Sequence, residues 1–151
     1  MPFIRSGEIN STKTELFISE EALKKSSAKL VNKNDLLLAI YGATSGEVSI
    51  SKIDGAINQA ILCIRGDFIN SFLYNWFKFN KGKIVSTYLQ GGQGNLSSEI
   101  VKELKMPYPS IPEQQKIAQF LTALDKKIVH TTSEIDKMKE WKRGLLQKMF
   151  V

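Results

Sequence analysis

Three glycine-containing loops hold most of the polar side chains that could do chemistry in this chain. They span residues 5–13, 42–46 and 90–95 and contain arginine, lysine, asparagine, glutamine, serine and threonine. Arginine and lysine suit phosphates and guanine, and asparagine and glutamine suit adenine, so this set is typical of DNA contacts. The same residues also form ordinary turns, which is the simpler interpretation of any one loop. For the three loops together, on a basic chain, both interpretations stand.

Functional side chains concentrate in loops, so we expect DNA contacts from the loops rather than from apolar faces. The expected contact residues are Arg5, Ser6, Asn10, Lys13, Thr44, Ser45, Gln93 and Asn95. Lys81 and Lys83 flank Gly82 and are expected to contact phosphates, which strengthens binding to all sequences alike.

No catalytic or metal-binding pattern is found along the chain. Residues 42–47 superficially resemble a phosphate loop but lack its Gly-Lys-Ser/Thr ending, and the glycines of 91–94 follow a predicted helix rather than a strand. His130 is the only histidine and is expected to be a partly exposed helix residue. Cys63 is the only cysteine and lies in an apolar run, so a His–Cys nucleophile pair is not expected. The sequence predicts no catalytic residue, no metal and no cofactor.

Composition is that of one globular core. The chain has 151 residues, of which 42% are hydrophobic, and a net charge of +6 that fits a nucleic-acid partner without requiring one. The longest apolar stretch, Leu36 to Tyr41, is far too short to span a membrane, and no charged and apolar leader precedes it. We expect a cytoplasmic protein in which Cys63 is a buried small hydrophobe.

A mixed set of short elements is predicted to position the loops. Strands are expected over 2–4, 36–41, 48–51 and 59–65, and helices over 20–26, 72–77, 83–89 and 97–104. The aromatic side chains of the second helix are expected to be mostly core, and they are Phe72, Tyr74, Trp76, Phe77 and Phe79. The fold class is therefore α+β, with a body of residues 1–109 and a helical arm of residues 110–151.

The helical arm has the most regular pattern in the chain. Ser110 and Glu113 have capping-box spacing at its start. Apolar residues then recur at spacings of four and three, broken only by Thr131 and Lys142. This seam consists of Ile117, Leu121, Leu124, Ile128, Ile135, Met138, Leu145 and Met149. A heptad seam on a rod of about 48 Å is typical of a helix that pairs with another helix. The alternative is a long amphipathic helix packed on its own domain.

Several segments occur in an order that resembles a known family. They are Asp35-Leu36-Leu37-Leu38, Tyr41-Gly42-Ala43-Thr44-Ser45-Gly46, Asn58-Gln59-Ala60, residues 90–97, residues 106–117 and residues 121–128. This succession resembles the specificity subunit of type I restriction–modification enzymes over roughly residues 3–150. Its strongest part is the segment containing Pro112-Glu113-Gln114 and the helix that follows it.

The resemblance implies a non-catalytic DNA-recognition subunit. In that family, two target-recognition domains are each followed by a long helix, and the helices pair antiparallel as a spacer between two DNA half-sites. Such a subunit delivers modification (methyltransferase) and restriction subunits to double-stranded DNA with a bipartite target. With one recognition domain and one helix, this chain is expected to be a half-subunit or a fragment of a full one.

The resemblance and the seam together predict a homodimer through the helical arm. A two-fold axis near residue 133 places Ile117 opposite Met149 and Leu121 opposite Leu145, and it brings Asp125 close to Lys139 of the other chain. A second hypothesis is a protein-interaction module that no longer binds DNA. A third is a small methyltransferase, which the absence of an Asn-Pro-Pro-aromatic motif disfavours.

Overall fold

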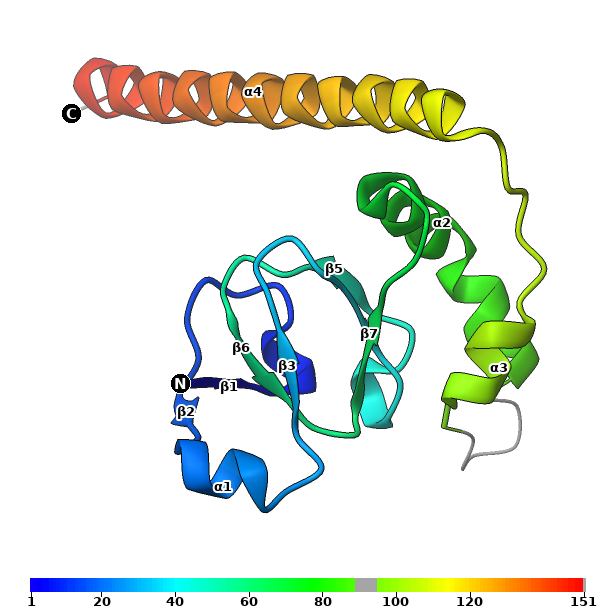
Figure 1. The fold of residues 1–151 in the computed structure, drawn as a ribbon. Coiled ribbons are helices and arrows are strands. Elements are labelled where there is room, and N and C mark those ends of the chain that lie inside the picture. The colour runs from blue at the N-terminus through cyan, green and yellow to red at the C-terminus, as the bar shows by residue number, and fades with distance from the viewer. Residues whose placement is uncertain (89–94, 151) are drawn as a thin grey trace.

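The computed structural model describes residues 1–88 and 95–150, which form a body of mixed strands and helices and one long helix (Figure 1). The strands are β1 (Pro2–Ile4), β2 (Leu16–Phe17), β3 (Lys29–Val31), β4 (Leu36–Ala39), β5 (Val48–Ile50), β6 (Gly55–Ile57) and β7 (Ile61–Ile64). The helices are α1 (Glu20–Lys24), α2 (Asn70–Tyr88), α3 (Ser98–Glu103) and α4 (Ile111–Met149), with 3-10 turns η1 (Ser6–Glu8) and η2 (Gly42–Thr44). The predicted α+β class is confirmed.

The strands form two sheets, with orders β2-β1-β6-β3 and β5-β4-β7. β1 and β6 are parallel, and the other pairs are antiparallel. The central strand β4 is buried on both faces, as its continuous apolar run predicts. Leu36 and Leu38 pack into one apolar cluster with α2, while Leu37 and Ala39 pack into a second cluster with Ile4 and its neighbours. The alternation of side chains along β4 thus joins the two halves of the body.

Three strands were not predicted from the sequence, and all three are very short. β2 has two exposed residues, and β3 has one buried residue, so neither carries a recognisable alternation. β6 contains Gly55, where an added Cβ would lie 2.8 Å from the carbonyl oxygen of Pro2. The close approach of β1 therefore requires a small residue that, from local propensity, argues against a strand.

α2 is one continuous helix, and the prediction of two separate helices over 72–77 and 83–89 is wrong as far as the described residues go. Gly82 lies inside it and is exposed, and an added Cβ there would meet no atom within 4 Å. Phe77 and Ile84 are both buried and lie on the same face, on either side of this glycine. Their packing offsets the roughly 1 kcal/mol that a helical glycine costs.

The aromatic residues of α2 divide between core and surface. Phe72 and Phe77 are buried as expected, and Trp76 is half-buried with its ring edge-to-face against Phe77 at 5.2 Å. Phe79 is 88% exposed, so the prediction that it belongs to the core is wrong. α2 turns the face of Leu73 and Phe77 towards the sheet, which leaves Phe79 on the surface.

The long helix begins where the sequence predicts, but a different interaction holds its start. Ser110 is the N-cap without a side-chain hydrogen bond, so the expected capping box is not formed. Instead Gln114 is fully buried: its Oε1 accepts from the backbone N–H of Ile69 at 3.0 Å, and its Nε2 donates to the carbonyl oxygen of Pro109 at 2.9 Å. One side-chain amide therefore connects the start of α2 to the segment that enters α4.

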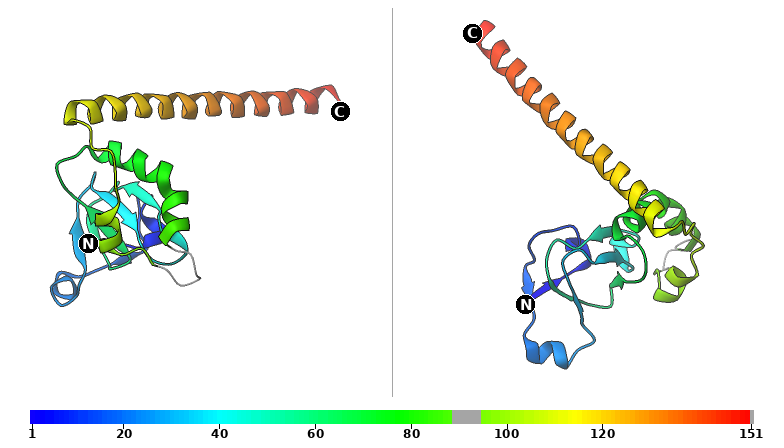
Figure 2. Two further views of the ribbon diagram at one scale, coloured as in Figure 1. Left: turned by 90° about the vertical axis from the view of Figure 1, so that its right-hand side faces the viewer. Right: turned by 45° about the horizontal axis from the view of Figure 1, so that its top comes forward.

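Beyond this anchor α4 leaves the body. Gln114 and Ala118 are its only buried residues within the described part of the chain, and residues 122–143 are exposed throughout. Figures 1 and 2 show the rod projecting past the body, with α2 beneath its first turns only. The alternative of a helix packed along its own domain therefore does not describe this structure.

We predict that Gln114→Leu lowers the free energy of unfolding by about 1–3 kcal/mol, because it removes the partner of the part-buried N–H of Ile69. Gln115→Leu is the matched control, because Gln115 is exposed and its loss should cost no more than about 0.5 kcal/mol. Urea denaturation followed by circular dichroism measures both. Equal stability of the two variants would contradict the anchoring role.

Candidate nucleic-acid interface

The first polar loop is closed by a network of charges around Arg5. Its Nε and Nη2 donate to the carboxylate of Glu8 at 3.1 Å each, and Nη2 also donates to Glu15. Glu8 further accepts from the hydroxyl of Thr14 at 3.1 Å and from the backbone N–H of Glu15 at 3.2 Å. Arg5 was expected to contact DNA, and in this structure it already has two carboxylate partners.

The same network shifts two ionisation equilibria. The hydrogen bonds from Arg5 lower the pKa of Glu8 to about 2, against the opposing effect of burial. The hydrogen bonds to Glu8 and Glu15 raise the pKa of Arg5. One cation shared between two carboxylates gives this part of the loop a net negative charge at neutral pH. A phosphate that binds the Nε and Nη2 edge of Arg5 must displace a carboxylate, whereas Nη1 donates to no described residue.

The rest of the first loop is more open. Lys13 is exposed, and among residues 1–88 and 95–150 it has no ion-pair partner. Asn10 is exposed, while its backbone carbonyl accepts from Nζ of Lys52 at 2.6 Å. Ser6 is half-buried at the start of η1. Lys52 was not predicted from the sequence, where it is simply a basic residue between β5 and β6.

The second polar loop packs on α2. Gly46 has a φ of +84°, and an added Cβ would lie 2.8 Å from Cγ2 of Val85, so the turn and the helix are in close contact. Lys81 forms an ion pair with Glu47, directly after the turn. The structure therefore brings residues 42–46 together with Lys81, a pairing across more than thirty residues that the sequence does not indicate.

Ser45 differs from the expectation of an exposed contact residue. It is 7% exposed, and its hydroxyl donates to the carbonyl oxygen of Ile40 at 3.0 Å. The tight turn between the two positive-φ glycines Gly42 and Gly46 directs this side chain inwards. Thr44, in contrast, is half-buried, and its hydroxyl reaches the carbonyl oxygen of Tyr41 at 3.4 Å.

The remaining candidates lie near the C-terminal half of α2 and beyond it. Lys83 is exposed and lines a cavity of about 300 Å³ between α2 and α3, together with Trp76, Tyr88 and Lys105. Asn95 is exposed. Gln93, which was expected to contact DNA, lies outside the described residues.

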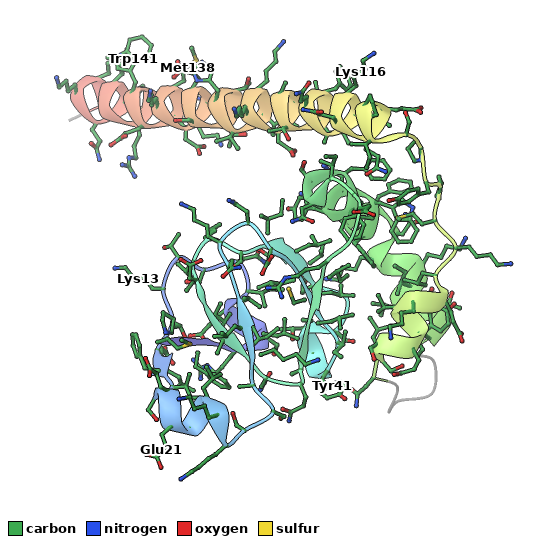
Figure 3. All side chains as sticks on the ribbon, in the orientation of Figure 1. Lys13, Glu21, Tyr41, Lys116, Met138 and Trp141 are labelled. Atoms are coloured by element: carbon green, nitrogen blue, oxygen red, sulfur yellow. The ribbon has the colours of Figure 1, made fainter. Side chains whose placement is uncertain are left out.

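The candidates thus form two separate groups. Figure 3 shows the labelled Lys13 and Tyr41 at different edges of the body. One group surrounds η1 and β2, and the other surrounds η2 and α2. The sequence does not indicate this separation, because it depends on which part of the fold each loop adjoins.

The remaining side chains that could take part in chemistry are Cys63, Asp35 and His130. Burial, and next the charge of Asp35, raise the pKa of the half-buried Cys63 thiol to about 11, so it is protonated at neutral pH. Asp35 accepts hydrogen bonds from Arg65, which hold the pKa of this carboxyl below its usual value. His130 is exposed on α4. The described residues contain no cluster of three His, Cys, Asp or Glu side chains fit for a metal, and none of their helices is long and apolar enough to cross a membrane.

The seam of α4 is largely uncovered. Ile117 and Leu121 are half-buried near α2, whereas the later seam residues are exposed, namely Leu124, Ile128, Ile135, Met138, Leu145 and Met149. Met138 and Trp141 point away from the body in Figure 3. Charges on α4 pair within the helix, as Glu134 with Lys137 at 3.0 Å and Asp136 with Lys139 at 3.1 Å.

One known protein family matches both the body and most of the rod. Residues 1–140 match the family described as the type I restriction modification DNA specificity domain. The chain belongs to this family. The match extends through the body and most of α4, so the specificity-domain family accounts for both parts of the structure.

Two curated relatives come from Methanocaldococcus jannaschii. The chain is 30% identical over 156 residues to the type I restriction enzyme MjaIX specificity subunit, covering 99% of this chain and 34% of that protein. It is 25% identical over 126 residues to the MjaVIII specificity subunit, covering 80% of this chain and 29% of that one. The chain thus spans about a third of the length of these relatives.

Solved structures show the same fold. A chain from a structure described as the structural basis of complex assembly and conformational transition of the type I R-M system aligns with a TM-score of 0.74 and 14% identity, covering 95% of this chain and 35% of that one. The type I restriction-modification S subunit from M. genitalium aligns with a TM-score of 0.57 and 19% identity, covering 100% and 38%.

We predict that the Glu8 carboxyl titrates near pH 2, and that Arg5→Ala moves its midpoint towards the ordinary value of 4.5. Because the folded-state pKa is depressed, the stabilising contribution of this pair is complete above pH 4.5 and is lost as the pH falls towards 2. Carboxyl NMR shifts measure the midpoint. Lys25→Ala, which removes the ion pair with Glu21, is the control and should leave Glu8 unchanged.

Proposed function

We propose that this chain is a non-catalytic DNA-recognition module of a type I restriction–modification system, acting as a pair joined through α4. The match of residues 1–140 to the DNA specificity domain carries the proposal, because it covers a body with two polar surfaces and a rod with an uncovered apolar seam. In this proposal the body is residues 1–109, which binds double-stranded DNA, and the helical arm is residues 110–151, which acts as spacer and docking element.

The DNA contacts come from the two groups of polar residues. The contact residues are Ser6, Asn10, Lys13, Thr44, Lys83, Gln93 and Asn95, with Arg5 and Lys81 joining when a phosphate replaces a carboxylate partner. Ser45 is left out because its hydroxyl is bonded inside the turn. When a phosphate replaces a carboxylate, Arg5 or Lys81 exchanges one anionic partner for another. These two residues therefore add little net electrostatic attraction for DNA, and their main contribution is to orient the phosphate.

A recognition module of this kind would act by positioning other subunits on DNA. The curated relatives are named specificity subunits of type I restriction enzymes. By analogy, this chain positions modification and restriction subunits on a bipartite DNA target. The surface available for a protein partner is the rod, because its residues 122–143 are exposed on every side.

The pairing of α4 is antiparallel. With a two-fold axis near residue 133, Ile117 lies opposite Met149 and Leu121 lies opposite Leu145 of the second copy. The later seam residues are large, apolar and exposed, which is costly unless another helix covers them. The pair holds one body near each end of the rod, an arrangement suited to two half-sites at a fixed separation.

A protein-interaction module without DNA binding is the second candidate. Arg5 and Lys81 are paired with carboxylates, which removes two cations from the expected DNA surface and favours this alternative. A gel shift against a random duplex pool separates the two. Retention of specific duplexes supports DNA recognition, and the absence of any retained duplex supports the alternative.

We predict that Lys13→Ala weakens binding to all duplexes alike and reduces the salt slope by about one, as expected for a lost phosphate contact. Asn10→Ala and Asn95→Ala should each lower discrimination between the selected sequence and its variants by about 1–3 kcal/mol. Titrations at several salt concentrations measure both effects. Lys24→Ala on α1 is the control for charge alone. Unchanged affinity and preference in all three variants would rule out this assignment.

We predict that Leu124→Asp combined with Ile128→Asp converts a micromolar dimer into a monomer, because each chain would bury two carboxylates in the apolar seam. Light scattering measures the mass. Val129→Asp is the control, since Val129 is exposed on the same helix outside the seam. A monomeric native chain, or a dimer that survives the double change, would contradict the pairing.

A further inference from the structure

An open groove lies between α2 and the first turns of α4. It has a volume of about 430 Å³ and is lined mainly by apolar side chains, with Phe72, Trp76 and Phe79 from α2 and Ile117 and Leu121 from α4. Phe79 is 88% exposed. An exposed phenylalanine beside a half-buried tryptophan is an apolar surface without a cover among the described residues.

The groove is continuous with the seam. Ile117 and Leu121 are the first two seam residues, and they also line the groove. A helix lying along the seam therefore passes beside Phe79 as it reaches the body. At this end of the rod, a helix that packs on the seam would therefore contact α2 as well as α4.

The C-terminal end of α4 has exposed apolar side chains that could fill this groove. Ala118 and Leu146 are four heptads apart, so they occupy the same heptad position on the same flank of the seam. At Ala118 this flank is buried against α2, while Leu146 is 44% exposed. Met149 is also exposed. The flank that α2 covers at one end of the rod is thus apolar and uncovered at the other.

Antiparallel pairing brings these two features together. A two-fold axis normal to the plane of two antiparallel helices keeps equivalent flanks on the same side of the seam. The Leu146 flank of the second copy therefore lies on the side where α2 covers Ala118. The register that sets Met149 opposite Ile117 also places Leu146 of the second copy level with the groove.

We propose that the groove between α2 and α4 binds the last turns of α4 from a second copy of this chain, with Leu146 and Met149 packed against Phe79 and Trp76. This inference rests on the helix pairing proposed above. We call this contact, the groove of one copy with the last turns of α4 from the other, a socket. Each dimer contains two sockets, one at each end of the rod. They tie each body to the far end of its partner's helix, which fixes the register and the distance between the bodies.

The test is complementation between two single variants of the full chain. Phe79→Asp and Leu146→Lys should each weaken the homodimer about tenfold or more, because each puts a charge into both apolar sockets. In an equimolar mixture, a heterodimer has one native socket and one socket that pairs the aspartate of one variant with the lysine of the other. Analytical ultracentrifugation with one variant labelled should show the heterodimer to be tighter than either homodimer.

Phe17→Asp on β2 is the matched control, because Phe17 is 73% exposed and belongs to the body away from α4; its dimer should equal the native one. Circular dichroism checks that all variants keep their helix content. If Phe79→Asp leaves a native-strength dimer, or if the mixture shows no preferred heterodimer, the socket is wrong. Loss of binding to a modification subunit without any change in the dimer would assign the groove to that partner instead.

These outcomes separate the socket from the proposals on which it rests. A native chain that is monomeric overturns the pairing and the socket together, whereas a native dimer broken only by Leu124→Asp with Ile128→Asp keeps the pairing and overturns the socket. The measurements contain no DNA, so failure of DNA recognition does not alter them.

Discussion

The buried amide of Gln114 sets the direction in which the rod leaves the body. Its two hydrogen bonds join the backbone before α2 to the connector before α4, in a position with no exposure to solvent. Ala118 adds one turn of apolar contact, and beyond Leu121 the rod makes few further contacts. A buried amide that satisfies two backbone groups is specific in geometry, since an apolar replacement fills space but leaves both groups unpaired.

The body below this anchor is organised by β4, whose two faces belong to two apolar clusters. One cluster includes α2, Ala118 and the groove beside Phe79, so the position of the rod depends on the same packing that holds the central sheet. The polar loops attach to different parts of this arrangement. The loop at η1 adjoins the four-stranded sheet, and the turn at η2 packs on α2, which gives the protein two distinct polar surfaces.

Pairing of charges within the protein shapes both surfaces. Arg5 is held by Glu8 and Glu15, and Lys81 is held by Glu47. Such pairs keep the loops in place before any ligand binds, and they reduce the unbalanced positive charge on offer. Affinity for a polyanion then depends on cations without such partners, of which Lys13 is the clearest example among the described candidates, and on exposed amides such as Asn10 and Asn95.

The sequence by itself determined the α+β class, the buried strand β4, the start of α4 and its uncovered seam, because each depends on a periodic pattern of neighbouring residues. The sequence also indicated the family, most strongly through the segments around Gln114. Tertiary structure decided the rest: the continuity of α2 through Gly82, the exposure of Phe79, the inward turn of Ser45 and the ion pair of Lys81 with Glu47. Each of these depends on packing or on a partner that the local pattern does not specify, so residue type and spacing alone could not predict it.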